Sequence, residues 1–179
     1  MACFDNEEVG SGTKQGADST LLRDTLTRIN NALGKTEEDY HRALASSFML
    51  SADNAHAVHP NHPEHTDVTN CTYMNEGVVV KSHAGQKYTS DAVSIAVFKM
   101  ICEKAGVPVQ FFANRSDEAG GSTLGNLAMA QVSMNTVDIG LPQLGMHSAY
   151  ETAGVKDVDS MIRAIQEFYQ THIKANADG

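Results

Sequence analysis

Two adjacent glutamates, Glu7 and Glu8, stand near the start of the chain between an apolar lead-in and a turn rich in glycine and serine. If this stretch ends a buried strand, the two side chains point in different directions, because side chains alternate along a strand. One carboxylate can then bind a metal ion while the other faces a water molecule. That division suits metal-assisted hydrolysis, with one ligand and one general base. The competing interpretation is a solvated acidic turn, and this interpretation is favoured when a Glu-Glu pair is considered alone.

Further residues with reactive side chains follow other predicted strands. Asp53 and Lys81 end two apolar stretches, while Asp117 and His147 lie in the loops after two more. In open α/β sheets, ligands bind outside the carboxyl ends of the strands, so these side chains are expected to gather there. Carboxylates with an imidazole and no thiolate suit a catalytic zinc ion, or manganese or cobalt in its place. A two-metal centre needs about five protein ligands, and three of the right type are present, namely Glu8, Asp53 and His147.

Four histidines fall in one short stretch directly after Asp53, and they are His56, His59, His62 and His65. The stretch is polar and contains two prolines, so it is expected to be a long loop whose histidines are exposed to solvent. His56 is the exception, because it lies only three residues past Asp53 and can face the same cavity.

The alternation of predicted strands and helices indicates an α/β protein with three layers. Apolar runs predict a strand tail over 1–4 and strands over 47–53, 77–81, 109–113 and 136–140. Helical periodicity and capping residues predict helices over 19–33, 36–46 and 89–105, one opened by Ser122 or Thr123, and one capped by Asp157 and running to Tyr169. The last of these helices is amphipathic, with an apolar side made of Val158, Met161, Ile162, Ile165, Phe168 and Tyr169.

Composition excludes several classes of function. The net charge of −9 on 179 residues argues against a nucleic-acid partner. No apolar run approaches the roughly 20 residues that span a bilayer, so no membrane partner is expected. The three cysteines have no C-x-x-C spacing, which predicts free thiols in a reducing compartment and hence a cytoplasmic protein. Neither a G-x-x-x-x-G-K-[ST] loop nor a G-x-S-x-G elbow is present.

Five blocks of the sequence, in order, resemble signature blocks of one family. They are residues 4–11 (FDNEEVGS), 53–61 (DNAHAVHPN), 77–81 (GVVVK) with 86–88 (QKY), 121–125 (GSTLG) and 142–148 (PQLGMHS). The resemblance is to the aspartyl aminopeptidase and yeast vacuolar aminopeptidase family of dinuclear zinc metallopeptidases. It covers almost the whole chain. It implies a three-layer α/β/α sandwich of the zinc-exopeptidase type and the removal of N-terminal residues from peptides.

The resemblance also implies roles for individual residues. Glu7 would be the general base that takes a proton from a metal-activated water. Glu8 and His147 would bind one zinc ion and Asp53 the other, with manganese or cobalt as substitutes. The remaining two positions, His56 and Lys81, would line the substrate site, where Lys81 would meet an acidic or polar side chain of the first residue of the peptide.

The chain departs from the family in length, because family members are more than twice as long and the difference lies before Glu7. That part carries a metal-binding histidine, the aspartate that bridges the two metals and an inserted dimerisation domain. We therefore expect residues 1–179 to be the C-terminal portion of a catalytic domain, a fragment incomplete at its N-terminus and inactive by itself. The alternative is a non-catalytic truncated homologue that acts as a structural or assembly module. Either way, uncovered apolar surface predicts a homo-oligomer.

Overall fold

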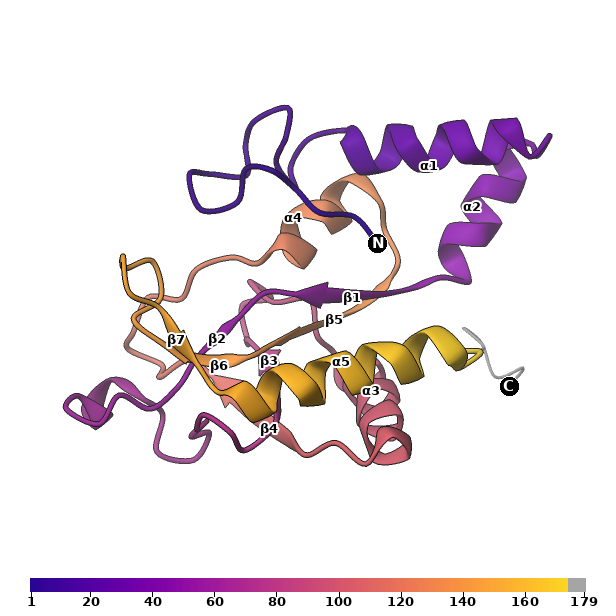
Figure 1. Cartoon of the computed structure of the whole chain (residues 1–179). Helices are drawn as coiled ribbons and strands as arrows, with labels where there is room; N and C mark the ends of the chain where they lie inside the picture. Colours follow the sequence, from indigo (N-terminus) through magenta and orange to yellow (C-terminus); the bar gives the residue numbers. More distant parts are fainter. Residues whose placement is uncertain (174–179) are drawn as a thin grey trace.

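The computed structural model of the chain describes residues 1–173 (Figure 1). Its helices are α1 (Leu21–Ala32), α2 (Glu37–Ala45), α3 (Ala92–Ala105), α4 (Leu124–Gln131), α5 (Val155–Gln170) and the short 3-10 helix η1 (Pro63–His65). Its strands are β1 (Phe48–Ala52), β2 (Ala55–His56), β3 (Val78–Ser82), β4 (Val109–Ala113), β5 (Asn135–Gly140), β6 (Pro142–Leu144) and β7 (Thr152–Ala153). No helix among these residues is long and apolar enough to cross a membrane.

A mixed four-stranded sheet in the order β1-β5-β3-β4 forms the middle layer of the molecule. The pairs β1–β5 and β3–β4 are parallel, whereas β3 runs antiparallel to β5. A small second sheet, β2-β6-β7, continues from the ends of β1 and β5. Helices α3 and α5 pack together on one side of the large sheet, and α4 packs on the other (Figure 1). The predicted α/β architecture with three layers is confirmed.

The alternation of side chains along β3 places the hydrophobic core on one face of the sheet and Lys81 on the other. The face that carries Lys81 is called the functional face. Val78 and Val80 point into the main core, where they pack against Phe98 of α3. The residues that alternate with them, Val79 and Lys81, point to the opposite face and are also buried. Because of this alternation, one continuous apolar-looking run supplies both the core and a buried charge on the other side of the sheet.

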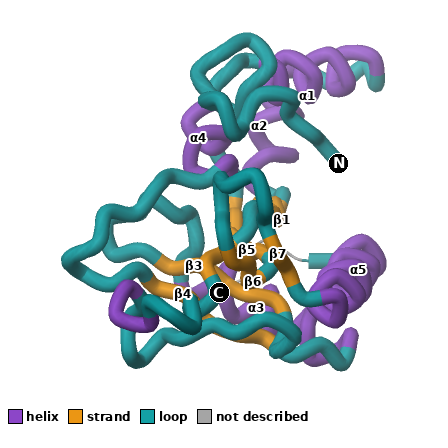
Figure 2. Tube along the Cα trace, turned by 60° about the vertical axis from the view of Figure 1, so that its left-hand side comes forward, coloured by secondary structure: helices purple, strands orange, loops and turns teal. Residues whose placement is uncertain are grey.

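The predicted strand at the N-terminus is wrong. Residues 1–19 form turns, and among the described residues no strand precedes β1. The backbone N–H of Asp5 donates to the carbonyl of Gln15 at 3.2 Å, and that of Gly10 donates to Glu7 at 2.9 Å. These amides therefore bond within the segment and not to the sheet. The segment leads into α1 and α2, and α1 packs beside α4 (Figure 2).

Helix α1 begins at Leu21 after Thr20, slightly later than the cap expected at Asp18 or Ser19, and the starts of α3 and α5 differ from the sequence prediction as well. Helix α3 is capped by Asp91, whose carboxylate accepts from the backbone N–H of Ser94 at 2.7 Å, and not by Thr89 or Ser90. Thr89 instead donates its backbone N–H to Asp138 of β5 at 2.6 Å. Helix α5 begins after Gly154, so Asp157 lies inside its first turn and is not its cap.

The apolar sides of α1 and α5 are less buried than their periodicity predicts. No residue of α1 is fully buried, and Leu21 and Ile29 are about half exposed. On α5 the fully buried residues are Asp157, Ser160 and Ala164, whereas Ile162 and other apolar residues face outward. The inward side also includes two large residues, since Met161 packs against the core and the ring of Phe168 lies 6.3 Å from that of Phe48 in β1.

Asp157 ties the start of α5 to the segment before β3. It is fully buried and accepts the backbone N–H groups of Asn75 at 2.6 Å and Gly77 at 2.9 Å. We predict that Asp157→Ala lowers the free energy of unfolding by about 2 kcal/mol, since a buried N–H donor loses its acceptor. Urea unfolding followed by circular dichroism measures this change.

The control for this prediction lies two residues along the same helix. Asp159 is exposed and pairs with Arg163 at 3.8 Å, so Asp159→Ala is expected to change stability by at most about 0.5 kcal/mol. Equal effects of the two substitutions would show that Asp157 does not hold this junction.

Candidate functional site

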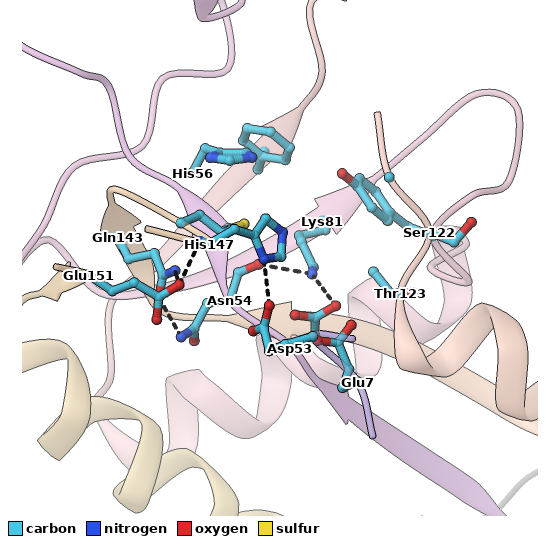
Figure 3. A pocket seen from close by; sticks show the side chains of 16 residues that line it. Glu7, Asp53, Asn54, His56, Lys81, Ser122, Thr123, Gln143, His147 and Glu151 are labelled. Carbon is cyan, nitrogen blue, oxygen red and sulfur yellow. Dashed lines mark hydrogen bonds and ion pairs between the residues drawn. The ribbon is translucent and has the colours of Figure 1, made fainter. Parts of the chain in front are cut away.

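A cavity of about 160 Å³ lies over the functional face of the large sheet, where the small sheet begins. All six residues predicted for the site line it, although they come from four separate stretches of the chain (Figure 3). They are Glu7, Glu8, Asp53, His56, Lys81 and His147. Asp117, the other strand-end candidate, lies elsewhere and pairs with Arg115 at 2.7 Å.

The side chains of Glu8 and His147 touch at one side of the cavity. Glu8 Oε2 lies 2.5 Å from His147 Nδ1, and this hydrogen bond raises the pKa of His147. Glu151 joins them, because one ligand atom from each of the three residues lies within 4.8 Å of the other two. Two carboxylates and an imidazole are a donor set that zinc accepts, so the residues present fit a catalytic zinc site.

The backbone of His147 is held in an unusual conformation. Its φ angle is +67°, in the left-handed region that residues other than glycine rarely adopt. Glu151 Oε1 accepts the backbone N–H of His147 at 2.7 Å, and it also accepts from the buried Gln143 at 3.4 Å. The Glu151 carboxylate therefore stabilises the turn that presents the His147 ring. Sequence reasoning missed Glu151, and its only signal was a carboxylate four residues after a candidate ligand.

Asp53 directly follows β1 and is partly buried. Its backbone N–H donates to Ile139 at 2.9 Å, which extends the β1–β5 pairing and fixes the position of the side chain. Burial raises the pKa of Asp53, and the nearby Lys81 opposes that rise. Asp53 is not part of the Glu8–His147–Glu151 group, so its carboxylate is available to a second metal ion.

Lys81 is a buried cation on the functional face of β3, with only 3% of its side chain exposed. Its Nζ lies 3.6 Å from Asp53 Oδ2, 3.2 Å from the carbonyl of Asn54 and 5.2 Å from the ring centre of Tyr88. Desolvation lowers the pKa of Lys81, whereas Asp53 and then Asp138 raise it.

The direction of β3 corrects one expectation about how these residues meet. Because β3 is antiparallel to β5, its carboxyl end does not lie at the edge where β1 and β5 end. Lys81 reaches the cavity from the face of the sheet, two residues beyond the pairing of Val79 with Gly140. Asp53 does lie at the shared carboxyl end of β1 and β5, as expected.

Glu7 and His56 are the last two of the six predicted residues, and their pKa values shift in opposite directions. Burial, followed by the charges of Asp53 and Glu8, raises the pKa of Glu7. A carboxylate whose pKa is raised is better suited to accept a proton near neutral pH. Desolvation lowers the pKa of His56, which favours the neutral ring beside the positive charges of His147 and Lys81.

Comparison with known proteins finds relatives and solved structures that match most of this chain. A probable M18 family aminopeptidase 2 of Clostridium acetobutylicum is 53% identical over 169 residues, which are 94% of this chain and 39% of that relative. A structure of the Ape4 and Nbr1 complex matches with a TM-score of 0.90 at 40% identity, covering 93% of this chain and 32% of that one. The structure of the S. cerevisiae mApe1 dodecamer matches with a TM-score of 0.81 at 31% identity, covering 93% and 36%.

These matches place the chain within a family while covering only part of each relative. The chain spans about two fifths of the length of the curated relatives that it matches, at 39% to 41%. A sequence profile described as aminopeptidase I zinc metalloprotease (M18) matches residues 1–169, nearly the whole chain. The structures above share its fold of the zinc-exopeptidase type. The chain therefore belongs to the aminopeptidase I zinc metalloprotease (M18) family.

Proposed function

We propose that the chain forms part of the catalytic centre of a metal-dependent aminopeptidase that removes N-terminal residues from peptides. The observation that carries this proposal is the convergence of Glu7, Glu8, Asp53 and His147 on one cavity beside the buried Lys81. Three carboxylates and an imidazole supply both metal ligands and a proton acceptor, which metal-assisted hydrolysis requires.

In this proposal Glu8 and His147 hold one zinc ion and Asp53 holds the other, with manganese or cobalt as substitutes. The contact between Glu8 and His147 and the separate position of Asp53 support this division. Metal ions bound there would polarise the peptide carbonyl and lower the pKa of a water molecule. Glu151 acts as a positioning residue, since it holds the backbone of His147.

Glu7 is the proposed general base. Its carboxylate lines the cavity without belonging to the Glu8–His147–Glu151 group, so it remains free to accept a proton from the attacking water. Its raised pKa supports this role, because a stronger base takes the proton more readily and can pass it on to the leaving amine.

Lys81 and His56 are proposed to contact the first residue of the peptide. The positive charge of Lys81 favours an acidic side chain, and its burial strengthens that attraction. Asp53 Oδ2 lies 3.6 Å from Lys81 Nζ and already offsets part of this charge. The preference for acidic over neutral N-terminal residues therefore depends on whether Asp53 also binds a metal ion. The neutral ring of His56, whose pKa desolvation lowers, can bond to the peptide without repelling its amino group.

Residues 1–179 are proposed to be the C-terminal portion of a peptidase catalytic domain that works as a homo-oligomer. The dodecamer of the S. cerevisiae relative supports this assembly. The half-exposed apolar residues of α1 offer surface for contact with other protein. A cytoplasmic location is proposed from Cys3, Cys71 and Cys102, which are all free thiols.

We predict that the purified chain, supplied with zinc, manganese or cobalt, hydrolyses no aspartyl, glutamyl or leucyl peptide above the rate without protein. The reason is that its described residues provide three of the roughly five ligands that a two-metal centre needs. Release of the N-terminal amino acid, measured by chromatography, tests this. Sustained turnover that Glu7→Gln abolishes would refute inactivity while supporting the proposed reaction.

The two adjacent glutamates are predicted to differ in metal binding. Glu8→Gln should weaken zinc binding by at least about tenfold, because it removes a charged ligand, whereas Glu7→Gln should change it less than about twofold. The zinc ion bound at this site is identified as the equivalent that is lost in the His147→Ala variant. Competition with a chromophoric chelator measures the affinity for that zinc ion. Equal losses in the two glutamine variants would contradict the division between ligand and base.

Glu151 is predicted to act on zinc binding through the backbone of His147. Glu151→Ala should weaken zinc binding at that site by roughly 10 to 100-fold, which is the usual cost of losing a group that orients a ligand. Glu151→Gln keeps a carbonyl oxygen to accept the same N–H and should restore most of the affinity. If the glutamine variant binds zinc as poorly as the alanine variant, Glu151 is itself a ligand.

A further inference from the structure

A second group of metal-binding side chains lies outside the candidate active site, in the loop between β2 and β3. Glu64 Oε1 is 3.1 Å from His62 Nδ1 and 4.0 Å from His65 Nε2, and the three ligand atoms all lie within 4.8 Å of one another. Two ligands on a tetrahedral zinc ion, each about 2.0–2.1 Å from the metal, are about 3.3 Å apart. Small rotations of these exposed side chains therefore bring the set to zinc-binding distances.

The ring of His65 is already oriented as it would be for metal binding. Its Nδ1 lies 2.7 Å from Glu118 Oε1, which leaves Nε2 directed toward Glu64. Histidines that bind metals almost always donate their other ring N–H to a carboxylate or carbonyl, which sets the tautomer and the ring direction. Glu118 comes from the loop after β4, 53 residues away along the chain, so this contact is independent of the local spacing of His62, Glu64 and His65.

The backbone that carries the three residues is also fixed. Glu64 and His65 lie in the short helix η1 and His62 is its N-cap residue, and the N–H of His65 donates to the carbonyl of His62 at 3.3 Å. The guanidinium of Arg115 donates to the carbonyl of Glu64 and binds Asp117, which offsets its positive charge. The loop after β4 therefore holds η1 in place through Arg115, and it orients one of its rings through Glu118.

We propose that His62, Glu64 and His65 form a second zinc site, with Glu118 as the residue that positions His65. Two imidazoles and one carboxylate favour zinc and similar transition metals over calcium and magnesium, which prefer oxygen ligands alone. Three protein ligands leave one position for water. The site shares no residue with the Glu8–His147–Glu151 group.

The position of this site indicates what a bound metal would do. His62, His65 and Glu118 line a cavity of about 430 Å³ that shares His56, Tyr88, Phe112 and Gly121 with the lining of the candidate active site. The contact between His65 and Glu118 already joins the β2–β3 loop to the segment after β4, and a metal ion on His65 Nε2 would strengthen it by favouring the tautomer that donates from Nδ1. It would thereby hold the wall of the larger cavity next to the candidate active site.

Zinc stoichiometry of the whole chain tests the proposal. After equilibrium dialysis and elemental analysis, His62→Ala/His65→Ala should carry one zinc equivalent fewer than the unmodified chain. Glu118→Ala should weaken that equivalent by roughly 10 to 100-fold, because His65 loses the acceptor that sets its tautomer. His41→Ala is the matched control, because His41 is another exposed histidine near a glutamate, with Nε2 at 3.9 Å from Glu37. It should bind as much zinc as the unmodified chain.

A zinc titration of the unmodified chain, followed by NMR, tests the site without relying on the folding of any variant. Zinc should shift the ring resonances of His62 and His65 in NMR spectra and leave those of His41 unchanged. Unshifted His62 and His65 rings, or an unchanged stoichiometry in the double variant, would overturn the proposal. Since His147→Ala removes a different zinc equivalent, failure of this site and failure of the candidate active site give separate results.

Discussion

The buried ion pair between Lys81 and Asp53 is the interaction on which the functional face depends. A lysine side chain that is only 3% exposed is costly to bury unless a carboxylate accompanies it, and Asp53 Oδ2 lies 3.6 Å from Lys81 Nζ. The pair joins the end of β1 to β3 although β5 lies between these strands. Asp138, on the intervening strand, adds a further negative charge that favours the protonated form of Lys81.

This charge arrangement constrains the surrounding structure. Asp138 is itself fully buried and accepts the backbone N–H and the hydroxyl of Thr89 at 2.6 Å and 2.9 Å. The segment that leads into α3 is therefore fixed by a carboxylate on the functional face, which is why α3 begins later than its periodicity predicts. The positions of these strands are therefore fixed twice, by hydrophobic packing on one side of the sheet and by charge pairing on the other.

Much of the fold could be predicted from the sequence, because the deciding signals are local. The valine run before Lys81 identifies β3, and a capping box at Thr36 starts α2 as expected. Gly106, in the left-handed conformation, ends α3. The strand expected before Glu7 failed because short apolar runs do not show where their backbone groups find partners. The apolar side of α5 is only partly buried, since Met161 and Phe168 pack inward while Val158, Ile162 and Tyr169 are exposed.

The candidate site was predictable in its residues and less so in its geometry. Strand-end positions and family-like blocks pointed to Glu7, Glu8, Asp53 and His147, which all line one cavity. The antiparallel direction of β3 and the backbone contact from Glu151 to His147 depend on long-range pairing and turn geometry that spacing does not contain. The roles assigned to these residues stay predictions.

The histidines after Asp53 show why residue type alone does not separate a ligand from a solvated side chain. His59, His62 and His65 are exposed, as a polar loop with two prolines suggests. What distinguishes His65 is a carboxylate from a distant loop on its other ring nitrogen. At His147 the orienting contact differs, because Glu151 holds the backbone N–H while the proposed co-ligand Glu8 contacts the ring. In both places the partner that orients the imidazole, more than the imidazole itself, indicates where a metal ion can bind.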